Sequence, residues 1–98
     1  SESAAFAHEK NYKEIAEKGE LKNSRWKQII DNDYHVLAEM IKSLTNNVER
    51  YQVNKLLADC VVFHERYVVN TSHKKRDYAT ALFLSLIELI QPVYSVAK

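Results

Sequence analysis

The stretch "SRWKQIIDNDYHVLAEMIKSL", residues 24–44, decides the fold class of this chain. Its apolar residues recur every three or four positions, which places their side chains on one face of an α-helix. That face is predicted to hold Trp26, Ile29, Ile30, Leu37, Met40, Ile41 and Leu44. Asn23 and Ser24 begin the pattern, and both are residue types that cap helix N-termini. The sequence therefore predicts an amphipathic helix at residues 24–45.

The remaining segments have the same helical pattern and little punctuation. One glycine and one proline in 98 residues leave few of the residues that hairpins and tight turns require. Further helices are predicted at residues 3–18, 48–69 and 73–90, the last stopped or kinked by Pro92. Because the connections are short, we expect an all-α fold, a small antiparallel four-helix bundle.

The composition limits the classes of function. With 98 residues, 46% of them hydrophobic, the chain is expected to form one helical domain. The balance of 14 Lys and Arg against 13 Asp and Glu gives a net charge of +1, so no broad positive field attracts nucleic acid or anionic lipid. A single cysteine cannot form an internal disulfide, which favours a reducing intracellular compartment, cytoplasmic or nuclear.

The ends of the chain and its apolar runs bear on membranes and secretion. The longest apolar run, Ala81–Ile90, is short and contains Ser85 and Glu88, so we expect a buried helix and no membrane contact. The chain opens on "SESAAF", without methionine and without the pattern of a signal peptide. This start is consistent with processing, or with a domain excised from a longer protein.

Two polar residues interrupt the predicted core. Asp33 lies on the apolar side of its helix, and His64 lies near the centre of a face that Val53, Leu57 and Cys60 share. If the two helices form a hairpin, Asp33 is level with Cys60 and within a turn of His64. A buried carboxylate needs a partner. The sequence therefore predicts a buried polar layer of Asp33, Cys60, His64 and Tyr78, in which Asp33 accepts a hydrogen bond from His64.

The same residues permit a chemical alternative. Cysteine, histidine and aspartate are the parts of a nucleophile, its base and an orienting group, so Cys60, His64 and Asp33 could form a thiol site. No glycine-rich turn offers an oxyanion hole, and a packed bundle leaves no substrate cleft. We therefore expect no enzyme activity and no cofactor, and interpret the layer as a device that fixes the register of the helices.

Metal and nucleic-acid sites have weaker signals. A di-metal bundle needs Glu-x-x-His pairs, and none of the four histidines has glutamate three positions earlier, so we expect no metal. The segment His73–Arg76, "HKKR", is the only basic cluster. It supports an alternative function as a nucleic-acid-associated regulator, although such a cluster at a helix start is more often a solvated turn.

The fourth helix gives the strongest functional signal. Its apolar residues surround nearly the whole circumference, and a helix of that kind favours burial on all sides. Phe83, Leu84, Ile87 and Ile90 are predicted to form an interface unless the first helix and residues 93–97 fold over them. We therefore expect a non-enzymatic, regulatory protein–protein interaction module that binds a protein partner or forms a homodimer. A small inhibitor or immunity-type protein is a further alternative.

Overall fold

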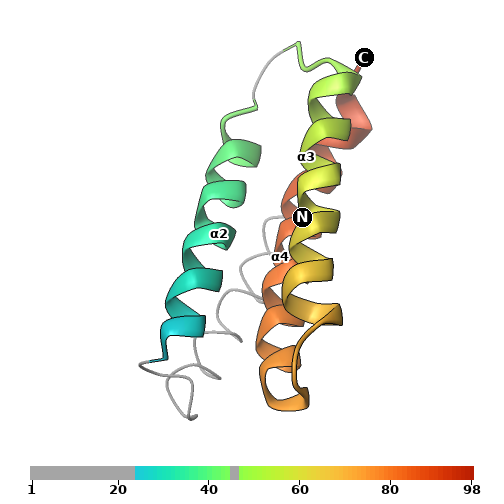
Figure 1. Cartoon of the computed structure of the whole chain (residues 1–98). Coiled ribbons are helices and arrows are strands. Elements are labelled where there is room, and N and C mark those ends of the chain that lie inside the picture. The colour runs from blue at the N-terminus through green and yellow to red at the C-terminus, as the bar shows by residue number, and fades with distance from the viewer. Residues whose placement is uncertain (1–23, 45–46) are drawn as a thin grey trace.

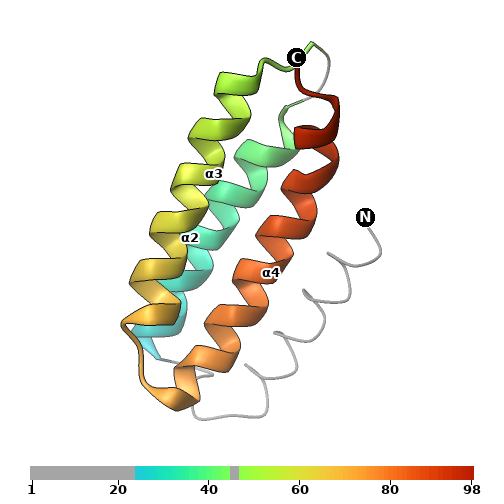
Figure 2. The same cartoon turned by 90° about the vertical axis from the view of Figure 1, so that its right-hand side faces the viewer.

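The computed structural model describes residues 24–44 and 47–98. This part contains α2 (Arg25–Lys42), α3 (Arg50–His64), a π-helical turn η1 (Glu65–Val69) that continues α3, and α4 (His73–Val96). Helices adjacent in sequence run antiparallel, with α4 packed against both α2 and α3 (Figures 1 and 2). The predicted all-α class is confirmed. The bundle is shown with three helices, because the helix predicted at residues 3–18 lies outside the described residues.

Local sequence signals explain where α2 and α3 begin. The Ser24 hydroxyl accepts a hydrogen bond from the Lys27 backbone N–H at 3.1 Å, so the predicted cap of α2 is confirmed. Asn47 adopts a positive φ of 56°, a conformation that asparagine tolerates better than most residues. The Gln52 side chain then accepts from the Glu49 N–H at 2.9 Å, as in a capping box. The sequence "TNN" at residues 45–47 predicts both the turn and the cap of this helix, but the cap is Glu49 instead.

Helix α4 continues past its predicted end at Ile90 and reaches Val96, with Pro92 inside it. Pro92 has no N–H to donate to the backbone carbonyl four residues earlier in the helix. Because Pro92 is exposed, water can reach that carbonyl. The end of the chain is also tied to the start of α3. Lys98 N–H donates to the Val48 carbonyl, and Arg50 N–H donates to the Lys98 carbonyl, both at 3.0 Å. These bonds hold the last turn of α4 in place.

The core lies on the axis between the three helices. Its buried residues are Ile30, Tyr34, Ala38 and Ile41 of α2; Val53, Leu56, Cys60, Phe63 and Tyr67 of α3 and η1; and Tyr78, Leu82, Leu86 and Ile90 of α4. Ile29 and Met40 were predicted to face this core and are exposed instead. Tyr34 occupies the core, and its hydroxyl hydrogen-bonds to Ser85 at 2.7 Å. The other five predicted residues of this face are buried or pack against the core, so the prediction is wrong only at its edges.

Candidate functional site

The predicted polar layer is divided between two faces of the domain. Asp33 accepts a hydrogen bond from the Tyr67 hydroxyl and lies 3.7 Å from the Arg66 guanidinium. His64 instead packs its ring against Phe83 of α4, with ring centroids 4.5 Å apart. Asp33 lies between α2 and α3, whereas His64 faces α4. The predicted hydrogen bond between Asp33 and His64 is therefore wrong.

The bond is absent because α3 buries a different face from the predicted one. The residues at the centre of its buried face are Phe63 and Tyr67, not His64, because burying an aromatic ring is favourable and burying imidazole is costly. Tyr67 then reaches Asp33 from η1. Burial and the hydrogen bond to Asp33 raise the pKa of Tyr67, so its hydroxyl remains a donor.

The other two members of the predicted layer are buried separately. Tyr78 is fully buried, and its hydroxyl donates to Asp31, which also pairs with Lys27 at 2.7 Å. Cys60 is fully buried, and burial raises the pKa of its thiol to about 11. Since the thiolate is the reactive form, Cys60 is in its unreactive state at neutral pH. Asp33 bonds to Tyr67 and pairs with Arg66, and His64 packs on Phe83, so no bond joins the three residues into a thiol site in the described part of the chain.

The predicted interface on α4 is partly buried. Ile90 is only 2% exposed and belongs to the core, so its place in an interface is wrong. Phe83 and Ile87 are half-buried, and Leu84 is 41% exposed. Residues 93–96 continue α4 and do not fold back over these side chains, whereas the first helix, which was the other predicted cover, lies outside the described residues. Helix α4 therefore presents three of the four predicted residues at its surface.

Helix α3 extends this apolar surface. His64 contacts Phe83, and Leu57 and Val61 precede His64 by seven and three residues, so all three lie on one side of α3. Val61 is 58% exposed. We call this surface the α3–α4 strip; its residues are Leu57, Val61, His64, Phe83 and Ile87, with Leu84 beside it. It contains no Lys, Arg, Asp or Glu.

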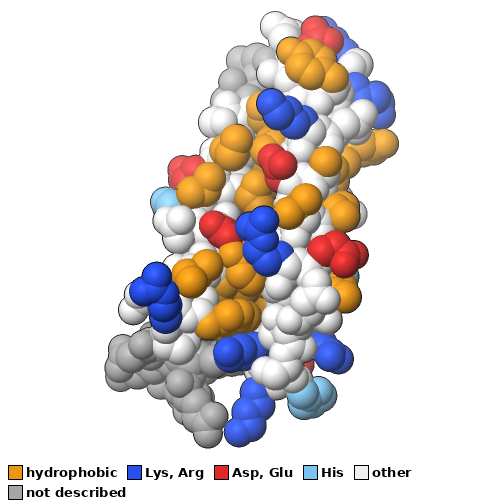
Figure 3. Space-filling view, viewed as in Figure 1, with side chains coloured by type: hydrophobic (Ala, Val, Ile, Leu, Met, Phe, Trp, Pro, Cys, Tyr) orange, Lys and Arg blue, Asp and Glu red, His pale blue; other side chains and the backbone are white. Residues whose placement is uncertain are grey.

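A second surface lies on another face of the bundle, between α2 and α3. It consists of two shallow hollows that lie next to each other, with Asp59 lining both. Apolar side chains follow the seam between these helices, with charged ones among them (Figure 3). We call this surface the α2–α3 groove; its residues are Asp33, Val36, Leu37, Met40, Ser43 and Leu44 of α2, and Tyr51, Gln52, Lys55, Leu56, Asp59, Val62, Phe63 and Arg66 of α3 and η1.

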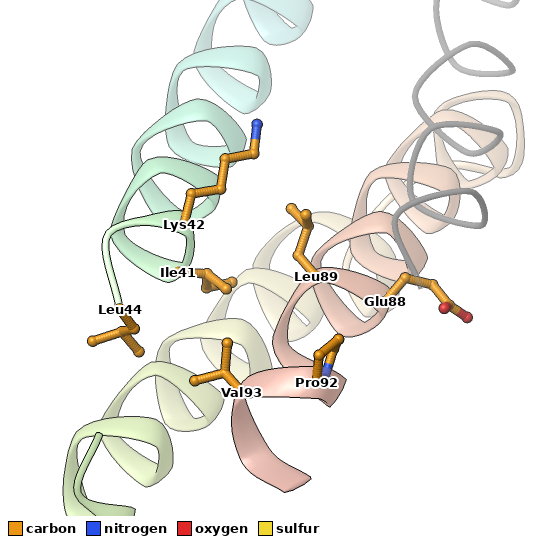
Figure 4. A pocket seen from close by; sticks show the side chains of 7 residues that line it. All are labelled: Ile41, Lys42, Leu44, Glu88, Leu89, Pro92 and Val93. Atoms are coloured by element: carbon orange, nitrogen blue, oxygen red, sulfur yellow. The ribbon is translucent and has the colours of Figure 1, made fainter. Parts of the chain in front are cut away.

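A third hollow, of about 370 Å³, lies between the end of α2 and the last turns of α4. Leu89 and Lys42 reach into it from opposite sides, and the Glu88 carboxylate points away from it (Figure 4). Ile41, Leu44 and the other lining residues are apolar. This arrangement brings no pair of chemically reactive groups together.

The basic cluster His73–Arg76 begins α4. Lys75 lies over the Trp26 ring, with its ammonium 5.4 Å from the ring centroid, so a cation–π contact to α2 occupies it. His73 and Arg76 are exposed. The cluster spans a single helical turn, and nucleic-acid binding by it remains a prediction.

Two further sequence predictions remain open. Among residues 24–44 and 47–98, no three His, Cys, Asp or Glu side chains gather where they could hold a metal ion. Helix α4, with 24 residues, is long and apolar enough to cross a membrane, but the core helix of a soluble protein meets the same criteria. The expectations of no metal and no membrane contact thus stay predictions.

Comparisons with known proteins add no identification. No family model, no curated protein and no solved structure matches this chain.

Proposed function

We propose that this protein is a non-enzymatic interaction module that binds a helix of a partner protein on the α3–α4 strip. The observation that carries the proposal is the exposure of Val61 at 58% and Leu84 at 41%, with half-buried apolar side chains between them. Exposed apolar side chains that lie together mark sites of protein contact more often than scattered ones do.

The shape and chemistry of the strip favour a helix as the bound element. Two nearly antiparallel helices form its walls, and a further helix packs naturally between two such helices by placing its side chains between theirs. The strip offers apolar contacts and the His64 ring, and no full charge, so its partner is expected to carry apolar residues at positions i, i+3, i+4 and i+7.

Adjacent valines on α3 provide a matched test of this proposal. Val61 lies on the strip, whereas Val62 is 50% exposed and lines the α2–α3 groove. A displayed library of helical peptides would be selected against the folded protein. We expect enriched peptides with one apolar face, which lose binding to Val61→Glu and keep binding to Val62→Glu. Enriched peptides that bind both variants equally would contradict the proposal.

A further inference from the structure

The α2–α3 groove has exposed apolar residues that the proposed function does not use. Val36 is 48% exposed, Met40 45%, Tyr51 69% and Val62 50%, and all four line the groove. Exposure of four large apolar side chains on one face is unfavourable unless something covers them.

The charges of the groove are incompletely paired. Asp33 and Arg66 form an ion pair at one end, with nitrogen and oxygen 3.7 Å apart. Lys55 and Asp59 line the middle of the groove one turn apart on α3. In the described part of the chain, neither makes a hydrogen bond or an ion pair. The middle of the groove therefore offers one positive and one negative group to an incoming surface.

These two charges are complementary to themselves. In a two-fold symmetric contact, residue i of one copy meets residue j of the other, and j meets i. A two-fold axis that crosses α3 at right angles, level with Leu57, places the two α3 helices antiparallel. Lys55 of each copy then lies opposite Asp59 of the partner subunit, so the contact forms two ion pairs and leaves neither charge unpaired.

The apolar residues fit the same axis. The contacts of Asp33 with Arg66 and Tyr67 set the register between α2 and α3. Counting the same number of residues from the Arg66 contact along each helix brings Val36 level with Phe63, with which it lines one hollow, and brings Met40 level with Asp59. Met40 therefore lies nearer the axis, and Val36 lies level with Tyr51 of the partner subunit. On α3, Tyr51 lies level with Val62 and Phe63 of the partner subunit, which gives an aromatic and aliphatic contact at each end.

We infer that a second copy of this chain docks on the α2–α3 groove, antiparallel, through Val36, Tyr51 and Val62 and reciprocal ion pairs between Lys55 and Asp59. The occupant is a second copy because the exposed charges balance and match under two-fold symmetry. This contact uses a different face from the α3–α4 strip, so it does not depend on the proposed function.

Charge exchange within the pair gives the test. Lys55→Asp makes the centre of the groove wholly acidic, and Asp59→Lys makes it wholly basic. Molar mass is measured by light scattering after size exclusion, over a range of concentrations, against a monomer mass of 11.4 kDa. We expect a dimer of the unmodified chain, a weakening of dimerisation of at least about tenfold in each variant alone, and a dimer again when the two variants are mixed in equal amounts.

The double variant with both substitutions restores opposite charges and is also expected to dimerise. Recovery in the mixture shows that both single variants fold. Val62→Glu is expected to dissociate the dimer, and Val61→Glu to leave it intact, which separates this contact from the strip. A monomeric unmodified chain at every concentration, or single variants that dimerise as well as the unmodified chain, would overturn the inference.

Discussion

Replacement of Leu82 by alanine tests which side of α4 is the core. Leu82 is fully buried, whereas Leu84, two residues further, is 41% exposed on the same helix. A fully buried Leu→Ala change costs about 2–5 kcal/mol, because transfer energy is lost and a cavity remains. We take about 3 kcal/mol for Leu82→Ala. For Leu84→Ala we expect less than about 1 kcal/mol, because its side chain is already partly in water and alanine has the higher helix propensity.

The assay is thermal and urea unfolding followed by far-ultraviolet circular dichroism. A domain of this size loses about 4–8 °C in Tm per kcal/mol, so Leu82→Ala should lower Tm by roughly 12–24 °C. Leu84→Ala should lower it by less than about 8 °C. The urea m-value should stay unchanged if both variants remain two-state. Equal losses in the two variants, or a larger loss in Leu84→Ala, would refute the orientation of α4.

Three further predictions concern single side chains. The free energy of unfolding should fall by up to about 2 kcal/mol as pH rises from 9 to 11, because the pKa of Cys60 is raised from 9.0 to about 11 in the folded protein and the unfolded thiol ionises first. Urea titrations of Cys60→Ala over the same pH range should show a smaller fall. Ser24→Ala should cost about 1 kcal/mol in urea midpoints, while Ser72→Ala, whose hydroxyl makes no capping bond, should cost clearly less. Tyr67→Phe should lower the free energy of unfolding by about 1 kcal/mol, because it removes the bond to Asp33, and Tyr51→Phe should lower it almost not at all. Equal losses by the same method would argue against the bond to Asp33.

The helices themselves were readable from the sequence. The apolar period of residues 24–44, the cap at Ser24 and the polar turn at residues 70–72 are local features, and local features determine where helices begin. The end of α4 is not local. Pro92 usually ends a helix, but the bonds from Lys98 to Val48 and Arg50 extend it, and they join segments far apart in sequence.

The faces of the helices were harder to predict. On α3, two neighbouring faces have the same spacing: Leu57 and His64 are seven residues apart, and so are Leu56 and Phe63. Periodicity alone therefore cannot say which face is buried. Packing chose Phe63, since aromatic burial is more favourable. On α2, Tyr34 was missed in the sequence; its hydroxyl has a buried partner in Ser85, which is 51 residues away in sequence.

The candidate surfaces were also only partly predictable from the sequence. The apolar character of Phe83, Leu84 and Ile87 was visible in the sequence, because it follows from composition. That Ile90 points inward depends on packing against α2 and α3. The α2–α3 groove was missed, since Lys55 and Asp59 look like ordinary solvated charges until the helices are placed side by side. The available signal was Val62, an apolar residue three positions after Asp59 and so on the same side of the helix.

Photochemical crosslinking in the cells that make the protein tests the central claim most directly. A photoreactive amino acid replaces Val61 on the α3–α4 strip or Val62 in the α2–α3 groove, and crosslinked peptides are mapped by mass spectrometry. We expect the probe at residue 61 to mark the apolar face of a helix in another protein, and the probe at residue 62 to mark a second copy of this chain. Crosslinks from residue 61 only to residues of its own chain would contradict the proposed interaction surface.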